Sequence, residues 1–353
     1  MRRKPIRKEP SLFYGMDCYE RVISRERTFQ RLKEEIPWEE FRGILSAVRK
    51  PSPKGGRPPY DEIFMFKCLV LQSLYDLSDE ALEAMIADRL SFQYFLDMNL
   101  DSDVPDHGTF WQFRELLKKN NLIEPLFKKF HDVLESRGII LRNGIIADAT
   151  IINAPKQRNT KGQNEALKEG QDKETAFPEA SEATLRHKDG DARWTLKRNV
   201  SYFGYKDHVL ADADSKFIVN FIVTSANVHD GTQLLSLLPQ YAEEPQPVYA
   251  DSAYGGSANI QGVRERGFIP KICEKGFRNR SLTEEQRQRN MQKSKIRCRI
   301  EHVFGDMNVR LKRLCVRTIG LERAKVKIGL LNLTYNIRRF LTLTSQTRKY
   351  AIM

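Results

Sequence analysis

Cysteine is scarce and scattered along the 353-residue chain, which argues against two kinds of small, cross-linked protein. The five cysteines show no CxxC spacing, and their number is odd: Cys18, Cys68, Cys273, Cys298 and Cys315. The sequence therefore indicates neither a disulfide framework nor a zinc knuckle. Cys298 and His302 stand four residues apart in an expected helix, but two ligands without further partners do not make a zinc site.

Long apolar runs are also missing. No stretch approaches the 18 consecutive apolar residues of a spanning helix, and no apolar signal core follows the charged start. Together with the cysteine pattern, this predicts a cytoplasmic protein without a membrane partner. Hydrophobic residues at 40% and charged residues at 30% are ordinary for a globular protein, and the length allows two domains.

Acidic residues are outnumbered. The chain has 46 Asp and Glu against 59 Lys and Arg, which gives a formal net charge of +13 and a pI of about 9.4. Such a balance favours a nucleic-acid partner, and a merely soluble basic protein is the alternative. Residues 275–323 alone hold 14 basic and 5 acidic residues. A second basic cluster, at residues 2–8, is either a DNA-gripping arm or a solvated tail.

Residues from about 20 to 137 are expected to form only helices. The dense apolar segment Tyr60–Tyr75 is long enough for a buried helix and follows two prolines. Ser78 is expected to cap the next helix, and Thr109 with Gln112 to form a capping box for a later one. Short helices with tight turns are typical of DNA-binding and dimerisation modules, and a plain helical bundle is the alternative. We expect this all-helical domain to cover residues 1–137.

Strands are expected after Gly138. Five segments have the composition of strands: 144–152, 205–212, 217–224, 248–251 and 268–272. The second and third are joined by turn residues and predict a hairpin. The polar stretch 156–193 predicts a flexible insert. Ser281 with Glu284 is expected to open a long helix reaching about Leu314, and a further amphipathic helix follows. These elements predict a mixed α/β domain over residues 138–345, in an order compatible with a ribonuclease-H-like sheet.

Two aspartates stand within or at the end of apolar strands. Asp148 lies between Ile146 and Ile151, and Asp251 closes the strand that begins at Val248. Aspartate is a poor strand former, and a buried carboxylate without a partner costs several kcal/mol. A shared divalent cation would explain the pair, because carboxylate oxygens suit magnesium. The alternative is that each aspartate ends its strand and caps a turn.

A third acid, Glu301, lies beside the apolar stripe of the expected long helix. The stripe consists of Ile296, Ile300, Val303, Phe304, Met307 and Leu311. Arg297 is four residues before Glu301 on the same face, so an exposed Arg–Glu pair is the alternative to a site role. Three acids suit phosphodiester chemistry, in which two metal ions about 4 Å apart activate the nucleophile and stabilise the leaving oxygen. Nearby Lys and Arg would then hold the DNA backbone.

Six segments, taken in order, resemble transposases of the bacterial insertion-sequence family five, whose catalytic domain is of the family-four type. The matching segments are Val104–Arg114, Ile146–Pro155, Gly204–His208, Asn227–Asp230, Tyr249–Gly255 and Arg299–Phe304. The resemblance covers residues 20 to 341. It implies a ribonuclease-H-like fold and a catalytic triad of Asp148, Asp251 and Glu301 that binds two Mg²⁺ or Mn²⁺ ions.

The same resemblance implies what the protein acts on. It implies that the helical N-terminal region recognises double-stranded DNA at the element ends, and that the enzyme cuts these ends and joins them to target DNA. A homodimer or a higher homo-oligomer on DNA is expected.

Around Glu301, the family's motif places Tyr, Arg, Glu and Lys at set spacing. Arg297 matches the arginine, whereas Ser294 stands where the tyrosine is expected and Asn308 where the lysine is expected. Arg310 or Lys312, about one helical turn away or less, is a candidate to replace that lysine. The expected DNA contacts are Arg297, Lys206, His208, Arg310, Lys312 and Arg313.

Two histidines and one tryptophan are further candidates. His208 and His229 could approach the triad, and the alternatives are a hairpin role and a helix-cap role. Trp194 borders the insert among basic residues, where it could stack on or wedge flanking DNA or simply anchor the insert.

Two other functions fit the same residues. A catalytically inactive or domesticated copy would bind DNA without cutting it, but all three acids are present and favour activity. A metal-dependent nuclease would hydrolyse DNA without joining strands. Strand joining to a target separates a transposase from that nuclease.

Overall fold

A computed structural model describes residues 27–48, 58–99, 101–140, 142–277, 280–310 and 315–351. The chain divides into two compact units, Met1–Leu116 with Phe340–Met353, and Leu117–Arg339. The boundary expected at residues 137 and 138 therefore falls inside the second unit. No helix in the described ranges has the length and apolar character needed to cross a membrane. The basic cluster at residues 2–8 lies outside the described residues.

Helices make up the regular structure of the first unit, as the sequence predicts. They are α2 (Arg27–Glu35), η1 (Trp38–Phe41), α3 (Arg42–Leu45), η2 (Ser46–Val48), α4 (Glu62–Tyr75), α5 (Asp79–Asp88), α6 (Leu90–Phe95), most of α7 (His107–Lys119) and the end of α16 (Leu321–Ala351). Aromatic rings fill the core between them, and Phe29, Phe66 and Phe92 are almost completely buried. The rings of Phe41 and Phe66 lie 5.1 Å apart, so aromatic packing joins the short helices.

Two predicted helix starts in this unit have different outcomes. The Ser78 hydroxyl accepts a hydrogen bond from the Ala81 amide, so the predicted cap of α5 is confirmed. The predicted capping box at Thr109 is wrong, because α7 already begins at His107. The Asp106 carboxylate accepts a hydrogen bond from the Thr109 amide at 2.6 Å. An ionised acceptor three residues earlier therefore caps the helix.

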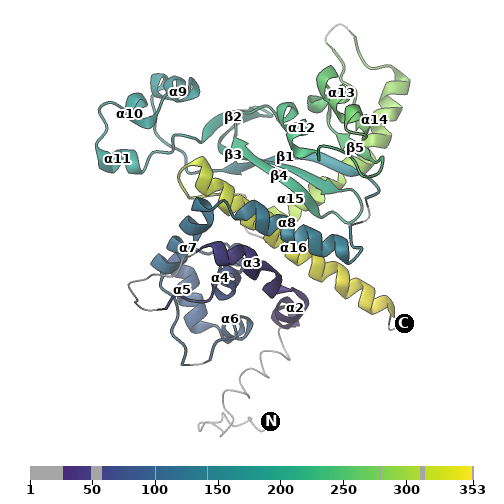
Figure 1. The fold of residues 1–353 in the computed structure, drawn as a ribbon. Helices are drawn as coiled ribbons and strands as arrows, with labels where there is room; N and C mark the ends of the chain where they lie inside the picture. Colours follow the sequence, from purple (N-terminus) through teal and green to yellow (C-terminus); the bar gives the residue numbers. More distant parts are fainter. Residues whose placement is uncertain are drawn as a thin grey trace, which may run out of the picture. The chain divides into compact units, whose positions relative to one another are not determined.

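A mixed six-stranded sheet forms the centre of the second unit (Figure 1). Its strands are β1 (Ile145–Asn153), β2 (Arg193–Lys197), β3 (Val200–Asp212), β4 (Ile218–Ser225), β5 (Pro247–Ala250) and β6 (Ile269–Ile272). The order is β2-β3-β1-β5-β6, and β4 also pairs with β3, beyond the residues that pair with β2. Strands β1 to β4 pair antiparallel, whereas β1, β5 and β6 pair parallel. This mixed sheet agrees with the ribonuclease-H-like order expected from the sequence.

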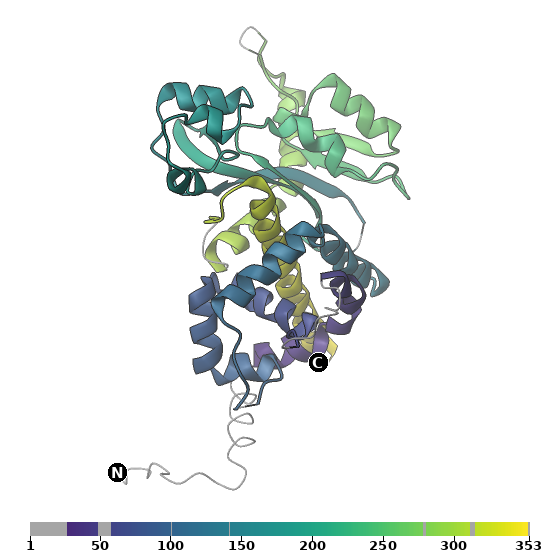
Figure 2. The same ribbon diagram turned by 60° about the vertical axis from the view of Figure 1, so that its left-hand side comes forward.

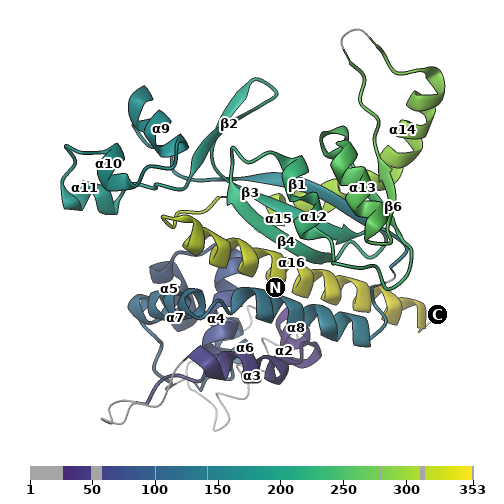
Figure 3. The ribbon, with the colours of Figure 1, turned by 45° about the horizontal axis from the view of Figure 1, so that its top comes forward.

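Helices cover both faces of the sheet. Figure 3 shows α8 (Ile123–Ser136) and α16 (Leu321–Ala351) side by side along one face. The rings of Phe127 and Phe221 join α8 to β4, at 4.9 Å between centroids. A Cβ on Gly329 of α16 would collide with Ile123, so a glycine permits this close helix crossing. The opposite face packs on α12 (Leu234–Leu237) and α13 (Ser257–Glu265), with Leu234 and Val263 completely buried.

The segment 156–193, which we expected to be a flexible insert, contains three short helices. They are α9 (Lys161–Lys168), α10 (Lys173–Ala176) and α11 (Glu182–Arg186), seen in teal beside the sheet in Figure 2. Each begins with a side-chain cap, at Thr160, Asp172 and Ser181 respectively. A small buried cluster of Leu167, Ala176 and Phe177 holds them together. Three apolar residues among many polar ones are enough to pack a small lobe, but they are too few to stand out in the composition.

The expected long helix is interrupted at Cys298. It consists of α14 (Glu284–Arg297) and α15 (Arg299–Arg310). The Cys298 carbonyl accepts a hydrogen bond from the Glu301 amide, three residues on, and this tightened turn separates the helices. The capping box also lies at Thr283 and Gln286 rather than at Ser281 and Glu284. Ile300, Val303 and Met307 of α15 are completely buried, as the predicted apolar stripe requires.

Candidate active site

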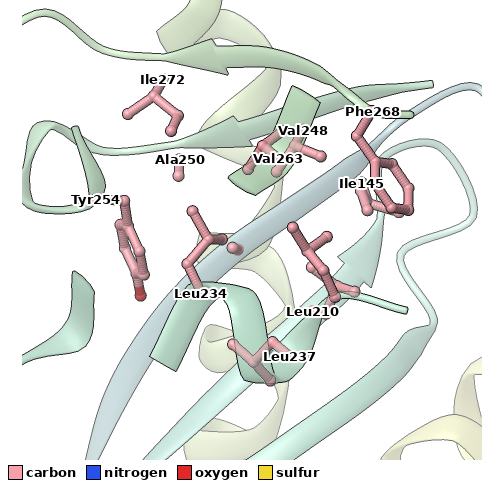
Figure 4. Close-up of a cluster of buried hydrophobic side chains, with 12 residues drawn as sticks. Ile145, Leu210, Leu234, Leu237, Val248, Ala250, Tyr254, Val263, Phe268 and Ile272 are labelled. Carbon is pink, nitrogen blue, oxygen red and sulfur yellow. The ribbon is translucent and has the colours of Figure 1, made fainter. Parts of the chain in front are cut away.

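Strand register places Asp148 and Asp251 at equivalent positions of neighbouring strands. In the parallel pair β1 and β5, Ile145 lies opposite Val248, and each aspartate comes three residues later. Ile145 and Val248 belong to the apolar cluster under α12 and α13 (Figure 4). Because side chains alternate along a strand, both aspartates project from the opposite face. The turn-capping alternative does not apply to Asp148, because β1 continues to Asn153.

Burial dominates the electrostatics of Asp148. Its side chain is 20% exposed, and its pKa is raised to about 6, first by burial and further by the negative charge of Asp251. The Ala149 amide donates to Oδ1 at 2.8 Å and the Arg297 Nη1 donates to Oδ2 at 3.3 Å, and both lower the pKa. The carboxylate is therefore costly to ionise in this position, and a bound cation would stabilise it.

Asp251 has a local role in addition to its place in the register. Its Oδ1 accepts a hydrogen bond from the Ala253 amide at 2.8 Å and caps the short helix η4 (Ser252–Tyr254). The turn-capping alternative is thus realised at this residue. The cap also fixes the carboxylate at the end of β5, beside Asp148.

Arg297 links the first aspartate to Glu301. Its Nη2 lies 3.9 Å from Glu301 Oε1, and its Nη1 contacts Asp148. The Glu301 side chain is 68% exposed, whereas the Arg297 side chain is 22% exposed. The arginine that we expected on DNA therefore lies between two members of the predicted triad.

The three acids are not already gathered around one point. Within the described ranges, the one group of His, Cys, Asp and Glu whose ligand atoms all lie within 4.8 Å of one another is His131, Asp132 and Glu135 on α8. In that group Glu135 is ion-paired with Arg142. The structure thus brings Asp148 and Asp251 together and connects Glu301 to them through Arg297.

The donor chemistry at this end of β1 and β5 fits a divalent cation. Carboxylate oxygens are the ligands that Mg²⁺ and Mn²⁺ prefer. The buried Tyr254 hydroxyl, which has no hydrogen-bond partner in the described chain, lies where the charges of Asp148, Asp230 and Asp251 act on it. The unsatisfied hydroxyl shows that the polar groups near these acids are not all paired within the described chain.

Two of the expected DNA contacts are engaged within the protein. Lys206 Nζ donates to Asp230 Oδ1 at 2.8 Å and to the Val228 carbonyl at 2.7 Å. His208 is completely buried, and its Nε2 lies 2.8 Å from the Thr224 hydroxyl. Burial lowers the pKa of His208 to about 4, so the imidazole is neutral at neutral pH. We therefore no longer assign a DNA contact to His208, because its place in the hairpin leaves it no exposed surface.

The remaining candidates are one histidine, one tryptophan and the basic residues at the end of α15 and just after it. His229 Nδ1 accepts a hydrogen bond from the Gly231 amide and caps η3 (Asp230–Gln233), which is the cap role. Trp194 on β2 is 38% exposed, and its ring contacts Phe203 at 5.2 Å between centroids. Lys312 and Arg313 lie outside the described residues, and the side chain of Arg310 is not described.

Sequence reasoning gave no role to Asp230 or Tyr254. Both lie in segments that matched the family pattern, Asn227–Asp230 and Tyr249–Gly255. That match was the signal available, but only the fold shows that the two segments meet.

Comparison with known families identifies the chain. A family model described as a transposase DDE domain matches residues 140–337, more than half of the sequence. The chain belongs to the transposase DDE domain family. A second model, described as a transposase domain (DUF772), matches residues 17–116 in the helical region. The family assignment agrees with the mixed ribonuclease-H-like sheet, and it makes the chain a DDE transposase, an enzyme of DNA transposition.

One solved structure is similar over most of the chain. It is the cryo-EM structure of a piggyBac transposase synaptic complex with hairpin DNA. The TM-score is 0.44 and the sequence identity 11%, over 99% of this chain and 79% of the other. Similarity at this level transfers no residue role.

Proposed function

We propose that this DDE transposase is a bacterial insertion-sequence enzyme of family five that cleaves DNA at the element ends and joins those ends to target DNA. The observation that carries the proposal is the parallel register of β1 and β5, which sets Asp148 and Asp251 side by side on one face. The family match over residues 140–337 supports it. In this proposal Asp148, Asp251 and Glu301 hold Mg²⁺ or Mn²⁺, with two ions per site.

The protein's own residues position and neutralise charge in this reaction. Bound divalent ions would activate the attacking water or 3′-hydroxyl and stabilise the leaving oxygen. Asp148 is fixed by the Ala149 amide and Asp251 by its turn, so both carboxylates are oriented before DNA arrives. Arg297 lies between Asp148 and Glu301 and is the cation we propose to contact the DNA phosphate next to the cut.

The proposed grip on DNA is electrostatic and lies outside the acids. The surplus of basic residues in 275–323, including Arg310, Lys312 and Arg313, would follow the backbone of double-stranded DNA. The exposed Trp194 would touch DNA that flanks the cut. Recognition of the terminal inverted repeats belongs to the N-terminal helical unit, and the active form on DNA is a homodimer or a higher homo-oligomer.

The test separates chemistry from binding. Asp148→Asn, Asp251→Asn and Glu301→Gln each remove a ligand charge while keeping the shape of the side chain. Each should reduce cleavage and joining by several kcal/mol in barrier, and each should leave metal-free binding of an end-containing duplex intact. Glu265→Gln, an exposed acid on α13, is the matched control and should cut normally. Mg²⁺ or Mn²⁺ should be required, and Ca²⁺ should support binding with little turnover.

Each outcome has a definite meaning. Normal cutting by Asp251→Asn would overturn the triad. Loss of both binding and cutting would make that acid structural. Parental protein that binds ends but never cuts would be an inactive DNA-binding copy, and cutting without joining to a target would indicate a nuclease that only hydrolyses.

A further inference from the structure

An aspartate that the proposed chemistry does not use lies in the interior of the second unit. Asp207 on β3 is completely buried, and so is Asn332 on α16, the helix that packs along this face of the sheet (Figure 3). The Asn332 Nδ2 donates a hydrogen bond to Asp207 Oδ1 at 3.2 Å. Moving a carboxylate from water into such a place is costly unless its charge is compensated, so the charge state of Asp207 needs an explanation.

The two side chains each leave one oxygen without a partner. Asp207 Oδ2 and Asn332 Oδ1 are both buried, and neither has a hydrogen-bond partner among the described residues. An ionised carboxylate only accepts hydrogen bonds, so an ionised Asp207 would have one donor for its two oxygens. A protonated Asp207 has a hydroxyl donor, and Asn332 Oδ1 is an acceptor on the amide that it already contacts. One proton thus supplies the kind of group that this pair lacks.

No cation in the described part of the chain compensates a charge at Asp207. Its neighbours across the sheet are the uncharged Thr150 on β1 and Val223 on β4, and α8 covers this face with the Phe127 ring. Burial raises the pKa of Asp207 well above its usual range, and the hydrogen bond from Asn332 opposes the shift only in part. The surroundings therefore favour the neutral acid.

The charged groups of the surrounding elements act elsewhere. Lys206 and His208 flank Asp207 on β3, and they project to the opposite face because side chains alternate along a strand. On the face of Asp207, Asp148 of β1 is paired with an arginine, and Arg338 of α16 lies 3.6 Å from Asp306 of α15. None of these groups is among those that shift the pKa of Asp207.

A second buried aspartate on β3 has the opposite surroundings. Asp212 is 1% exposed, and its Oδ1 accepts hydrogen bonds from the amide and the hydroxyl of Ser215, both at 2.6 Å. Its Oδ2 accepts from the Arg142 amide at 3.2 Å. Both oxygens of Asp212 thus have donors, as a carboxylate requires. The two aspartates are equally buried on one strand and differ in the donors around them.

We propose that Asp207 is held as a neutral carboxylic acid in the folded protein and that its proton is part of the contact that fastens α16 to β3. One turn further along α16, Asn336 binds the amide and the carbonyl of Ile218, at 2.9 and 2.8 Å, and fastens the same helix to β4. Ionisation of Asp207 would place an uncompensated charge under the helix, so the contact weakens as the pH rises. The proposal does not depend on the proposed metal chemistry.

Asp207→Asn tests the role of the proton. Asparagine has the shape of the neutral acid and carries both a donor and an acceptor at every pH. An unfolded aspartate ionises at a pKa of about 3.9, so above that pH the folded parent holds one proton more than the unfolded chain. The ratio of folded to unfolded parent, relative to that of the variant, should fall about tenfold per pH unit between pH 5 and pH 7. Urea unfolding of the full chain measures this ratio, and other titrating groups such as His208 are common to both proteins.

Infrared spectra of the folded full chain detect the proton directly. Parent protein with isotope-labelled aspartate should show a protonated carboxyl band at pH 7 that is missing from Asp207→Asn. Asp148 has a pKa of about 6 and is mostly ionised at that pH. A shift of the band in Asn332→Ala would assign it to this pair, even if Asp207→Asn failed to fold.

Asp212→Asn is the matched control. An NH₂ group in place of one oxygen of Asp212 would face donors, so this variant should have a lower thermal midpoint at every pH and keep the protonated carboxyl band. Parallel pH profiles for the parent and Asp207→Asn would overturn the proposal. A folded parent without a protonated carboxyl band at pH 7 would also overturn it, because Asp207 would then be ionised and its free oxygen would be satisfied by a bound water or ion.

Discussion

At the scale of single residues, the buried imidazole of His208 should make stability depend on pH. Burial lowers its pKa from about 6.5 to about 4, so below pH 6.5 the unfolded chain takes up a proton that the folded chain does not. The free energy of unfolding should therefore fall as the pH drops from 7 towards 4, by up to roughly 3 kcal/mol. Urea unfolding between pH 7 and pH 5 should show a shallower decline for His208→Gln than for the parent.

Other titratable groups near His208 also affect the pH dependence of stability, so the parent must be compared with the His208→Gln variant. Asp230 raises the pKa of His208 and Lys206 lowers it, but both effects are smaller than that of burial. The adjacent Asp207 is completely buried and its pKa is raised, so its contribution has the opposite sign and is lost as the pH rises. Asp207 is present in both proteins, so the difference isolates the imidazole. Parallel pH profiles would contradict the burial argument.

A buried ion pair in the helical unit should contribute strongly to stability. Arg114 donates to both carboxylate oxygens of Asp79 at 2.5 Å, and the side chains are 9% and 18% exposed. Arg114→Met would leave Asp79 in a poorly solvated place without its bidentate partner, at a cost of about 3–5 kcal/mol. Arg186→Met, which breaks an exposed pair with Glu182, is the control and should change the free energy of unfolding by less than about 0.5 kcal/mol. Chemical unfolding of both variants measures the contrast, and equal losses would refute it.

At the scale of elements, the β2–β3 ribbon is suited to DNA. Arg198 and Asn199 form its tight turn with left-handed backbone angles. Beside them Leu196 is 67% exposed and Val200 is 50% exposed. The charge of Lys197 lowers the pKa of Asp148, so the ribbon's tip reaches towards the first acid of the proposed site. Exposed apolar side chains flanked by cations, next to these acids, favour a contact with the DNA near the cut.

The ribbon prediction concerns salt dependence. Lys197→Glu with Arg198→Glu should weaken binding to an end-containing duplex and reduce the slope of log affinity against log salt by about two, because two phosphate contacts are lost. Lys161→Glu, a 91% exposed cation on α9, serves as the control and should leave the slope nearly unchanged. The measurement is a titration at several salt concentrations. An unchanged slope in the double variant would remove the ribbon from the DNA path.

At the scale of the whole molecule, the unit boundary decides which fragment folds. The second unit begins at Leu117, so α8 belongs with the sheet. Phe127 packs on Phe221, and Ile123 contacts the crossing point at Gly329. A fragment of residues 117–339 should therefore unfold cooperatively. A fragment of residues 138–339 would expose the apolar surface that α8 covers, and it should have a lower thermal midpoint or fail to fold.

The same fragments test where end recognition resides. Both lack the helical unit, so neither should prefer element ends over random DNA in a shift assay, although their positive charge should still bind DNA. Equal midpoints for the two fragments would contradict the assignment of α8. A retained preference for ends would place recognition in the second unit.

Local sequence patterns were sufficient for much of this protein. Strands such as β1 and β5 were predictable because β-branched runs bounded by turn residues have few alternatives, and the Ser78 cap follows from its own neighbours. The three acids could be named because Asp148 and Asp251 conflict with their apolar strands and the motifs around all three occur in family order. The basic surplus, and with it the expectation of a nucleic-acid partner, is a property of composition alone.

Only the tertiary structure decided which of these residues meet. Pairing of β1 with β5 brings together segments about a hundred residues apart in the chain, and no local pattern encodes that register. The burial of side chains also depends on elements that are distant in the sequence. His208 is a neutral core residue because neighbouring strands and helices cover it. Arg297 lies between Asp148 and Glu301 because its helix packs near β1. The insert folds on a small apolar cluster, and Gly231 allows the turns η3 and η4 to approach closely. Desolvation, close packing and long-range charge depend on partners far along the chain, so the fold had to supply them.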